Sequence, residues 1–159
     1  MASADERVAA AAAAAGLKIE IRRFPEGTRT AEDAARAVGC EVGQIVKSLV
    51  FLADGRPVVA LVSGADRLDP MRLATVSGAA AVDRADGDAV RAATGYAIGG
   101  VPPFGHAQAI PVYLDRELLR YDVVWAAAGR PDAVFAVTPE DLVRASGAAI
   151  ADLRVGAAG

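Results

Sequence analysis

Residues whose types and spacing could do chemistry lie in two stretches of the 159-residue chain. The first runs from Gly95 to His106 and holds four of the sixteen glycines, two of the eight prolines and the single histidine. Proline removes backbone donors and glycine allows conformations that side chains forbid, so this stretch predicts a rigid, irregular loop. Its backbone N–H groups could face a ligand and stabilise negative charge on it. A sharp connection between two core elements is the alternative.

The second stretch, Ile45 to Leu52, is a nearly continuous apolar run that contains Lys47 and Ser48. Alternation along a strand puts Lys47 on one face and Ser48 on the other. A lysine in such a run either reaches the rim of the sheet or is met by an anion or a carbonyl, because burying an unpartnered ammonium is costly. The alternative is an edge-strand lysine that discourages pairing with other molecules.

Metal and nucleophile motifs are missing from the sequence. One histidine and one cysteine, Cys40, cannot build a zinc site, and neither HExxH nor CxxC occurs. A Ser-His-Asp triad would need His106, and no G-x-S-x-G elbow accompanies it. The glycines fit neither a P-loop nor the dinucleotide-binding pattern. If the protein is an enzyme, we expect it to use positioned backbone donors and one cation.

The composition is that of a globular protein, with 53% hydrophobic and 23% charged residues, and the length fits a single domain over residues 1–159. The net charge of −3 argues against a broad nucleic-acid clamp, so any contact with nucleic acid should be local. No apolar run is long enough to span a bilayer, and the single cysteine fits a reducing compartment. We therefore expect a cytoplasmic protein with no membrane partner.

Hydrophobic periodicity and turn residues predict hairpins that alternate with helices, without a regular succession of parallel units. This order predicts an α+β domain with a mixed, largely antiparallel sheet flanked by helices. A tail over 155–159 should be frayed or disordered. The expected helices are an N-terminal one within 1–16 and others at 30–39, 69–76, 86–94 and from 138; the expected strands are 17–22, 45–52, 57–62, 80–82, 110–114, 123–127 and 133–137; a turn is expected at 24–27.

The lysine strand and the glycine-proline loop together resemble the YbaK family, which is related to the insertion (editing) domain of bacterial prolyl-tRNA synthetase. The resemblance rests on VKSLVF at 46–51 and on TGYAIGGVPPFG at 94–105, and it extends from about Phe24 to Leu153. It implies a YbaK-like domain whose sheet forms a partial barrel.

The resemblance also implies an activity: hydrolysis of the ester that joins a wrong, small amino acid to tRNA, typically tRNA(Pro), by a free-standing enzyme without a metal or other cofactor. The acylated 3′ end would be the partner, with prolyl-tRNA synthetase as a further candidate, and the protein would be a monomer or a homodimer. The catalytic contributions would come from Lys47, Gly99, Gly100 and Gly105, and the substrate contacts from Ile45, Ser48, Val101, Pro102, Pro103, Phe104 and His106.

Some positions depart from the family pattern, so the amino acid that is removed stays open. Many relatives carry serine or threonine where Pro102 stands, and asparagine or threonine where Ser48 stands; His106 follows the glycine at a position that varies. Two other functions also remain open at this point. One is a non-catalytic module that docks a synthetase or an acylated 3′ end, and the other is a serine hydrolase acting on small esters.

Overall fold

A central hairpin of β2 (Val46–Ala53) and β3 (Arg56–Ser63) organises the larger sheet in the computed structural model, which describes residues 2–24 and 30–157. The strands of this sheet lie in the order β4-β2-β3-β5-β8, with β4 at Val82–Arg84, β5 at Val112–Asp115 and β8 at Ala149–Ala151. β2 pairs antiparallel with β3 and β4, whereas β5 runs parallel to β3 and to β8.

The turn of the central hairpin is made by Asp54 and Gly55. Both have a positive φ, of 49° and 83°, which matches the backbone twist that a tight hairpin needs. The carboxylate of Asp54 also accepts hydrogen bonds from the N–H groups of Ala80 and Ala81, so the turn is tied to the segment before β4. The predicted Asp-Gly hairpin is confirmed.

A second, smaller sheet is antiparallel and has the order β1-β7-β6, with β1 at Ile21–Arg23, β6 at Val124–Ala127 and β7 at Ala133–Val137. An isolated parallel bridge between Ile45 and Trp125 joins it to the larger sheet just before β2 begins. The predicted α+β class with mixed, largely antiparallel pairing is confirmed, and the sheets stay open and do not close into a barrel.

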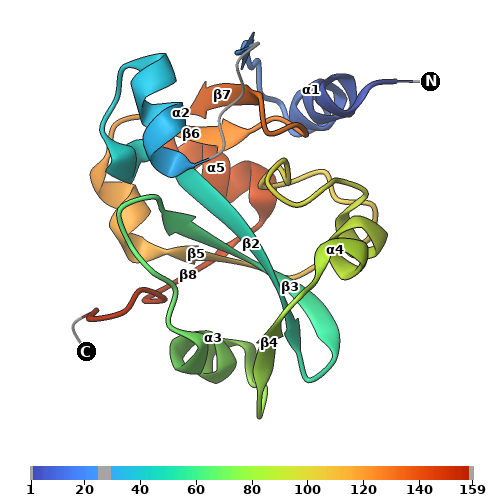
Figure 1. Ribbon diagram of the computed structural model, residues 1–159, viewed down its shortest axis with the longest axis vertical. Helices are drawn as coiled ribbons and strands as arrows, with labels where there is room; N and C mark the ends of the chain where they lie inside the picture. Colours follow the sequence, from blue (N-terminus) through green and yellow to red (C-terminus); the bar gives the residue numbers. More distant parts are fainter. Residues whose placement is uncertain (1, 25–29, 158–159) are drawn as a thin grey trace.

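Short helices surround the sheets in Figure 1, with α3 beside β4 and α4 on the side of the glycine-proline loop. Each α-helix begins at a side chain that accepts a hydrogen bond from a backbone N–H of the first turn, as expected for serine, threonine or aspartate at the N-cap. None of the described helices is long and apolar enough to cross a membrane. The helices are α1 (Ala4–Ala14), α2 (Ala31–Val38), α3 (Pro70–Ser77), α4 (Gly87–Thr94) and α5 (Pro139–Ser146), with 3-10 turns at Val42–Gln44 and Arg116–Arg120.

The main core lies between the two sheets and is closed by helices from both ends of the chain. Phe135 of β7, Leu61 of β3 and Leu114 of β5 are fully buried in it, together with Leu142 of α5 and Val8 of α1. Complete burial of each such side chain contributes about 1.5–3 kcal/mol. This core therefore fixes the relative positions of β2, β6 and the loop that follows α4.

Several features differ from the expected elements, one of them being the strand expected at 80–82, which lies at Val82–Arg84. The strand expected at 17–22 is shorter and begins at Ile21, because Leu17 instead donates its N–H to Ala12 and closes the end of α1. The short strand β8 was not predicted. The tail that was expected to fray from Val155 is packed against the domain as far as Ala157, the last described residue. The N–H of Val155 donates to the C=O of Arg67, and Ala157 is buried. Residues 158–159, and the predicted turn beyond Phe24, lie outside the described residues.

Candidate active site

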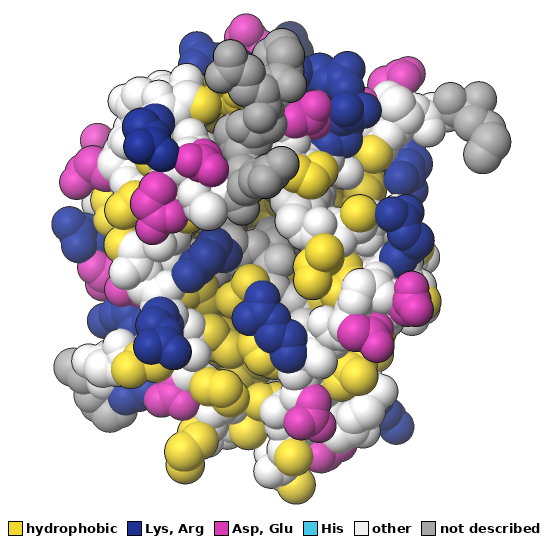
Figure 2. Space-filling model, in the orientation of Figure 1, with side chains coloured by type: hydrophobic (Ala, Val, Ile, Leu, Met, Phe, Trp, Pro, Cys, Tyr) yellow, Lys and Arg dark blue, Asp and Glu magenta, His cyan; other side chains and the backbone are white. Residues whose placement is uncertain are grey.

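A cavity of about 440 Å³ opens beside β2, between the two sheets. Figure 2 shows hydrophobic side chains on the floor of a hollow in front of β2, with Lys and Arg side chains next to them. The lining comes from the start of α2, from β2, from the end of β4, from α4, from the glycine-proline loop and from the hairpin formed by β6 and β7, called here the second hairpin. The lining residues are Thr30, Ala31, Ala34, Ile45, Val46, Lys47, Ser48, Leu49, Val50, Arg84, Ala85, Val90, Ile98, Gly99, Val101, Trp125, Ala126, Ala127, Pro131 and Val134.

The cavity exists because one edge of β2 is only partly paired. On that edge β4 covers residues 51–53, and the N–H of Ala85 donates to the C=O of Val50. The smaller sheet packs against β2, but its only described strand pairing there is the bridge between Ile45, just before β2, and Trp125. Between these points, residues 46–49 have no strand partner on this side within the described residues. In an antiparallel strand the N–H and C=O of one residue share a side, and every second residue repeats it. The backbone polar groups of Ser48 therefore face the open edge, like those of Val50.

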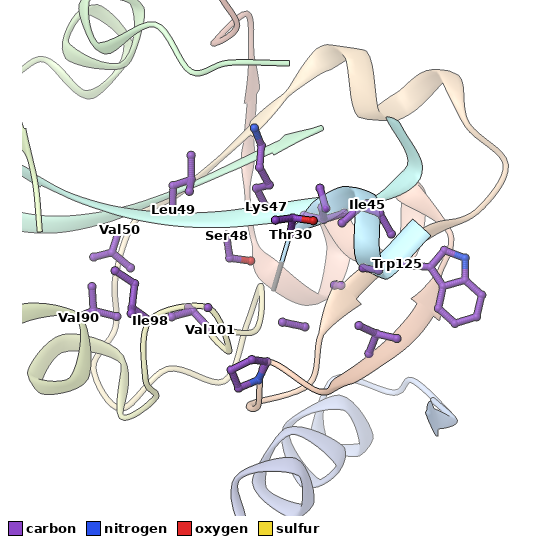
Figure 3. A pocket seen from close by; sticks show the side chains of 18 of the residues that line it. Thr30, Ile45, Lys47, Ser48, Leu49, Val50, Val90, Ile98, Val101 and Trp125 are labelled. Carbon is purple, nitrogen blue, oxygen red and sulfur yellow. The ribbon is translucent and has the colours of Figure 1, made fainter. Parts of the chain in front are cut away.

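Together with Arg84, Lys47 is one of the two cationic side chains among the described residues that line this cavity. Its side chain leaves β2 on the face opposite to that of Ser48 (Figure 3), and its ammonium donates a hydrogen bond to the backbone C=O of Asp66. Burial lowers the pKa of Lys47 below that of an ordinary lysine, while the nearby carboxylates of Asp66 and Glu32 act in the opposite direction. An ammonium can donate three hydrogen bonds, so a ligand can accept from Lys47 without displacing Asp66.

Ser48 supplies a hydroxyl on the other face of β2, directed toward the loop that holds Ile98 and Val101 (Figure 3). Less than 1 Å² of its Oγ is exposed, and the hydroxyl has no hydrogen-bond partner among the described residues. Buried hydroxyls are normally partnered, because burial without a hydrogen bond costs free energy. The folded structure thus gives the Ser48 hydroxyl no hydrogen bond from the described residues, which makes it a candidate contact for a ligand.

The first half of the glycine-proline loop forms one wall of the cavity through Ile98, Gly99 and Val101. Gly99 has a φ of +88°, and the N–H of Gly100 donates to the C=O of Ala97 over 3.0 Å, which is the pattern of a type II turn. Gly100 packs so closely on the second hairpin that a Cβ there would lie 2.9 Å from the backbone N of Arg130. The N–H of Gly100 is therefore already used within the turn, and Gly100 does not line the cavity.

The second half of the loop lies in the core. Pro102, Pro103 and Phe104 are buried and are not among the lining residues. The ring of Phe104 packs against that of Phe135 with 5.7 Å between the ring centroids. This half of the loop therefore supports the wall from behind.

Gly105 and His106 also lie away from the cavity. Gly105 has a φ of +73°, and a Cβ there would lie 2.5 Å from the Cβ of Ala11 in α1. The Nε2 of His106 lies 2.8 Å from the C=O of Pro102, and because a carbonyl can only accept, Nε2 donates. His106 thus closes the loop on itself, and burial lowers its pKa.

Five of the predicted site residues therefore meet at the cavity, namely Ile45, Lys47, Ser48, Gly99 and Val101, and the other six lie behind its wall. Their contributions to catalysis and binding stay predictions. Among the lining residues that sequence reasoning missed are Thr30, Ala31 and Ala34 at the start of α2, Arg84 of β4, and Trp125 to Ala127 of β6. The single tryptophan of the chain, Trp125, was the one residue whose type could have suggested that the second hairpin contributes to the site.

The arrangement suits a small, partly apolar ligand that carries a polar or anionic group. Ala31, Ala34, Ile45 and Trp125 pack together and form an apolar end. Lys47 and the loop backbone provide donors, and no carboxylate or imidazole is among the described lining residues. Within 2–24 and 30–157, no group of three His, Cys, Asp or Glu side chains is placed to hold a metal ion.

Comparison with known proteins agrees with this picture. The sequence matches the family described as "Aminoacyl-tRNA editing domain" over residues 25–145. A protein of Enterococcus faecalis, named as a candidate Cys-tRNA(Pro)/Cys-tRNA(Cys) deacylase, is 32% identical over 131 residues, which cover 82% of this chain and 80% of that one. The proline–tRNA ligase of Citrifermentans bemidjiense is 38% identical over 92 residues, 58% of this chain and 16% of the ligase.

A solved structure extends the likeness to the whole fold. It is described as that of a candidate trans-editing enzyme for prolyl-tRNA synthetase, and it is 45% identical, with a TM-score of 0.92 over 98% of this chain and 99% of that one. The cavity beside β2 thus belongs to a fold shared along nearly the entire length. On this evidence the chain belongs to the aminoacyl-tRNA editing domain family.

Proposed function

We propose that this protein is a deacylase that hydrolyses, in trans, the ester bond of a mischarged aminoacyl-tRNA, with tRNA(Pro) carrying a small wrong amino acid as the substrate. The observation that carries the proposal is a single cavity of about 440 Å³ bordered by the held cation Lys47 on one side and by the turn at Ile98 and Gly99 on the other. Membership of the editing-domain family supports the reaction, and the names of the relatives support tRNA(Pro).

In the proposed reaction, water attacks the ester carbonyl, the bond to the ribose oxygen breaks, and the free amino acid and the tRNA 3′ hydroxyl leave. Negative charge develops on the carbonyl oxygen in the transition state. A single preorganised donor to such an oxygen contributes about 2.7–4 kcal/mol. The candidate donors are the backbone N–H of Gly99 on the loop side and the ammonium of Lys47, which leaves β2 on the opposite face. Since the described lining offers no general base, we assign water activation to a ribose hydroxyl of the substrate.

The apolar end of the cavity would take the amino-acid side chain. Ala31, Ala34 and Trp125 leave room for a small group, and a cavity of this kind discriminates by about 1–3 kcal/mol for each methylene. A synthetase faces the same limit, which is the reason that a separate editing enzyme is useful. The proposal places the protein in the cytoplasm, where aminoacylation of tRNA occurs, with prolyl-tRNA synthetase as a further partner.

The test is a deacylation screen of purified protein against tRNA(Pro) charged with alanine, cysteine, serine, threonine or 2-aminobutyrate. We expect release of at least one of these amino acids and a loss of about 100- to 1000-fold in Lys47→Ala, since one transition-state donor is removed. Lys18→Ala is the matched control, because Lys18 is the only other lysine and does not line the cavity. Full activity of Lys47→Ala would refute the role of Lys47, and binding of every charged tRNA without turnover would identify a non-catalytic module instead.

A further inference from the structure

A second cavity, of about 430 Å³, lies on the other side of the loop that borders the first. Gly95, Tyr96 and Ala97 line the second cavity, and the next residues of the loop, Ile98 and Gly99, line the first. Pro131 lines both cavities. The loop and the tip of the second hairpin therefore form a common wall between two cavities.

The second cavity is basic, whereas the chain as a whole has a net charge of −3. Three arginines line it, Arg7 of α1, Arg91 of α4 and Arg130 of the second hairpin, against the one carboxylate of Asp132. Figure 2 shows Lys and Arg side chains along the margin of the molecule on the side of α1 and α4. Arg130 is neutralised by Asp132 through two hydrogen bonds of 2.8 and 3.0 Å, so two positive charges remain uncompensated.

The two remaining arginines differ in how firmly they are held. The guanidinium of Arg7 lies 4.5 Å from the ring centroid of Tyr96 and donates to the C=O of Gly95 over 3.2 Å, so its position is fixed while most of its donors stay available. Arg91 is exposed and has no ion-pair or hydrogen-bond partner among the described residues. A pre-positioned guanidinium beside one whose donors are all available is a suitable arrangement for an oxyanion with several acceptors.

We propose that this second cavity binds a phosphate group of the acylated RNA strand, at a nucleotide that precedes the terminal one. The inference rests on the proposed function, because it takes the terminal ester to lie in the first cavity. An RNA strand that leaves the first cavity across Ile98 and Pro131 reaches the side of the wall where Arg7 and Arg91 lie. The guanidinium fork matches a phosphate in shape and in charge. A single phosphate contact is consistent with the net charge of −3, which argues against a broad nucleic-acid clamp but allows local binding of RNA.

The test compares Arg91→Gln with Arg56→Gln. Both changes remove one positive charge from an exposed arginine that has no partner among the described residues, and Arg56, the first residue of β3, lines neither cavity. We expect Arg91→Gln to raise KM for mischarged tRNA by about threefold to tenfold and to make the salt dependence of log affinity shallower by about 0.7, the value for one phosphate of a single strand. On a 3′-aminoacyl-adenosine, which has no phosphate, Arg91→Gln should act like the wild type, and Arg56→Gln should act like the wild type on both substrates.

Three results would overturn the inference. Equal KM values for tRNA in the two variants would show that Arg91 makes no phosphate contact. An equal loss on the phosphate-free adenosine ester would place the effect in the first cavity. A weaker affinity for 5′-CMP with unchanged affinity for tRNA would assign the cavity to a free nucleotide. If the wild type does not deacylate any charged tRNA, the proposed function fails, and the affinity of both variants for uncharged tRNA still tests the phosphate site by itself.

Discussion

Replacement of Ser48 by alanine should stabilise the protein, although Ser48 borders the proposed active site. The Oγ of Ser48 has less than 1 Å² exposed and no hydrogen-bond partner among the described residues. A buried polar group without a partner costs about 1–3 kcal/mol, and alanine removes that cost while it leaves no donor or acceptor behind. Part of the gain is offset because alanine packs slightly less well in a strand. We expect Ser48→Ala to raise the free energy of unfolding by about 1 kcal/mol, or Tm by about 2–4 °C.

Ser63 in the adjacent strand β3 provides the matched control. It is also buried, but its Oγ donates to the C=O of Gly43 over 2.7 Å and accepts from the N–H of Ala65 over 3.2 Å. Ser63→Ala leaves both of those groups without their partner, so it should lower the free energy of unfolding by about 1–3 kcal/mol. The same chemical change thus has opposite effects at two serines of one hairpin.

Urea unfolding followed by circular dichroism measures both effects, and an unchanged m-value confirms that only stability has changed. The deacylation rate of Ser48→Ala should fall in the same preparation, because the hydroxyl is the candidate contact to the substrate. A Ser48→Ala variant less stable than the wild type by more than about 0.5 kcal/mol would refute the reasoning, since it would mean that the hydroxyl is satisfied in the folded protein.

Three further predictions concern the loop. Gly100→Ala should lower the free energy of unfolding by about 1–3 kcal/mol in urea titrations, because its Cβ would lie 2.9 Å from the backbone of Arg130; an unchanged midpoint would contradict this packing. Burial lowers the pKa of His106 below 6.5, so the wild type should lose stability as pH falls from above 6.5 through the folded-state pKa, and His106→Gln, measured at about pH 7.5 and about pH 5, should not show this loss. Ile98→Ser should raise KM for the mischarged tRNA yet change stability by less than about 0.5 kcal/mol, because 54% of Ile98 is exposed; a large fall in Tm would assign Ile98 to the core.

Much of the fold could be predicted because its signals are local. The Asp-Gly turn, the capping residues and the glycine after each of α2, α3, α4 and α5 determine element bounds through contacts within a few residues. The strand β8 escaped prediction because Ala149–Ala151 is short and carries no alternating pattern; its only support is the parallel pairing with β5. The tail was predicted to fray because chain termini usually do. The hydrogen bond that holds Val155 could not be foreseen, because its partner Arg67 is distant in sequence.

The site was predictable only where chemistry and sequence motif coincide. Lys47 and Gly99 were found because a cation in an apolar run and a glycine in a proline-containing loop are conspicuous. Phe104 and His106 were assigned to substrate binding because they belong to the same stretch of sequence, but the loop turns inward after Val101 and buries Phe104 against Phe135. Ala34 and Trp125 were missed because, in the sequence, an apolar residue that lines a cavity cannot be distinguished from one in the core. The distinction requires the relative positions of the two sheets.

The positions of Lys47 and Ser48 on opposite faces of β2 make the site dependent on strand register. Side chains alternate along a strand, so a slip of β2 by one residue against β3 would exchange the face of the cation with that of the hydroxyl. Eight consecutive residue pairs hold the register, from Val46–Ser63 to Ala53–Arg56, and the turn at Asp54 and Gly55 sets it. A two-residue turn at the far end of the hairpin thus determines which groups meet the ligand, and an insertion there would rearrange the active site without changing any residue that lines it.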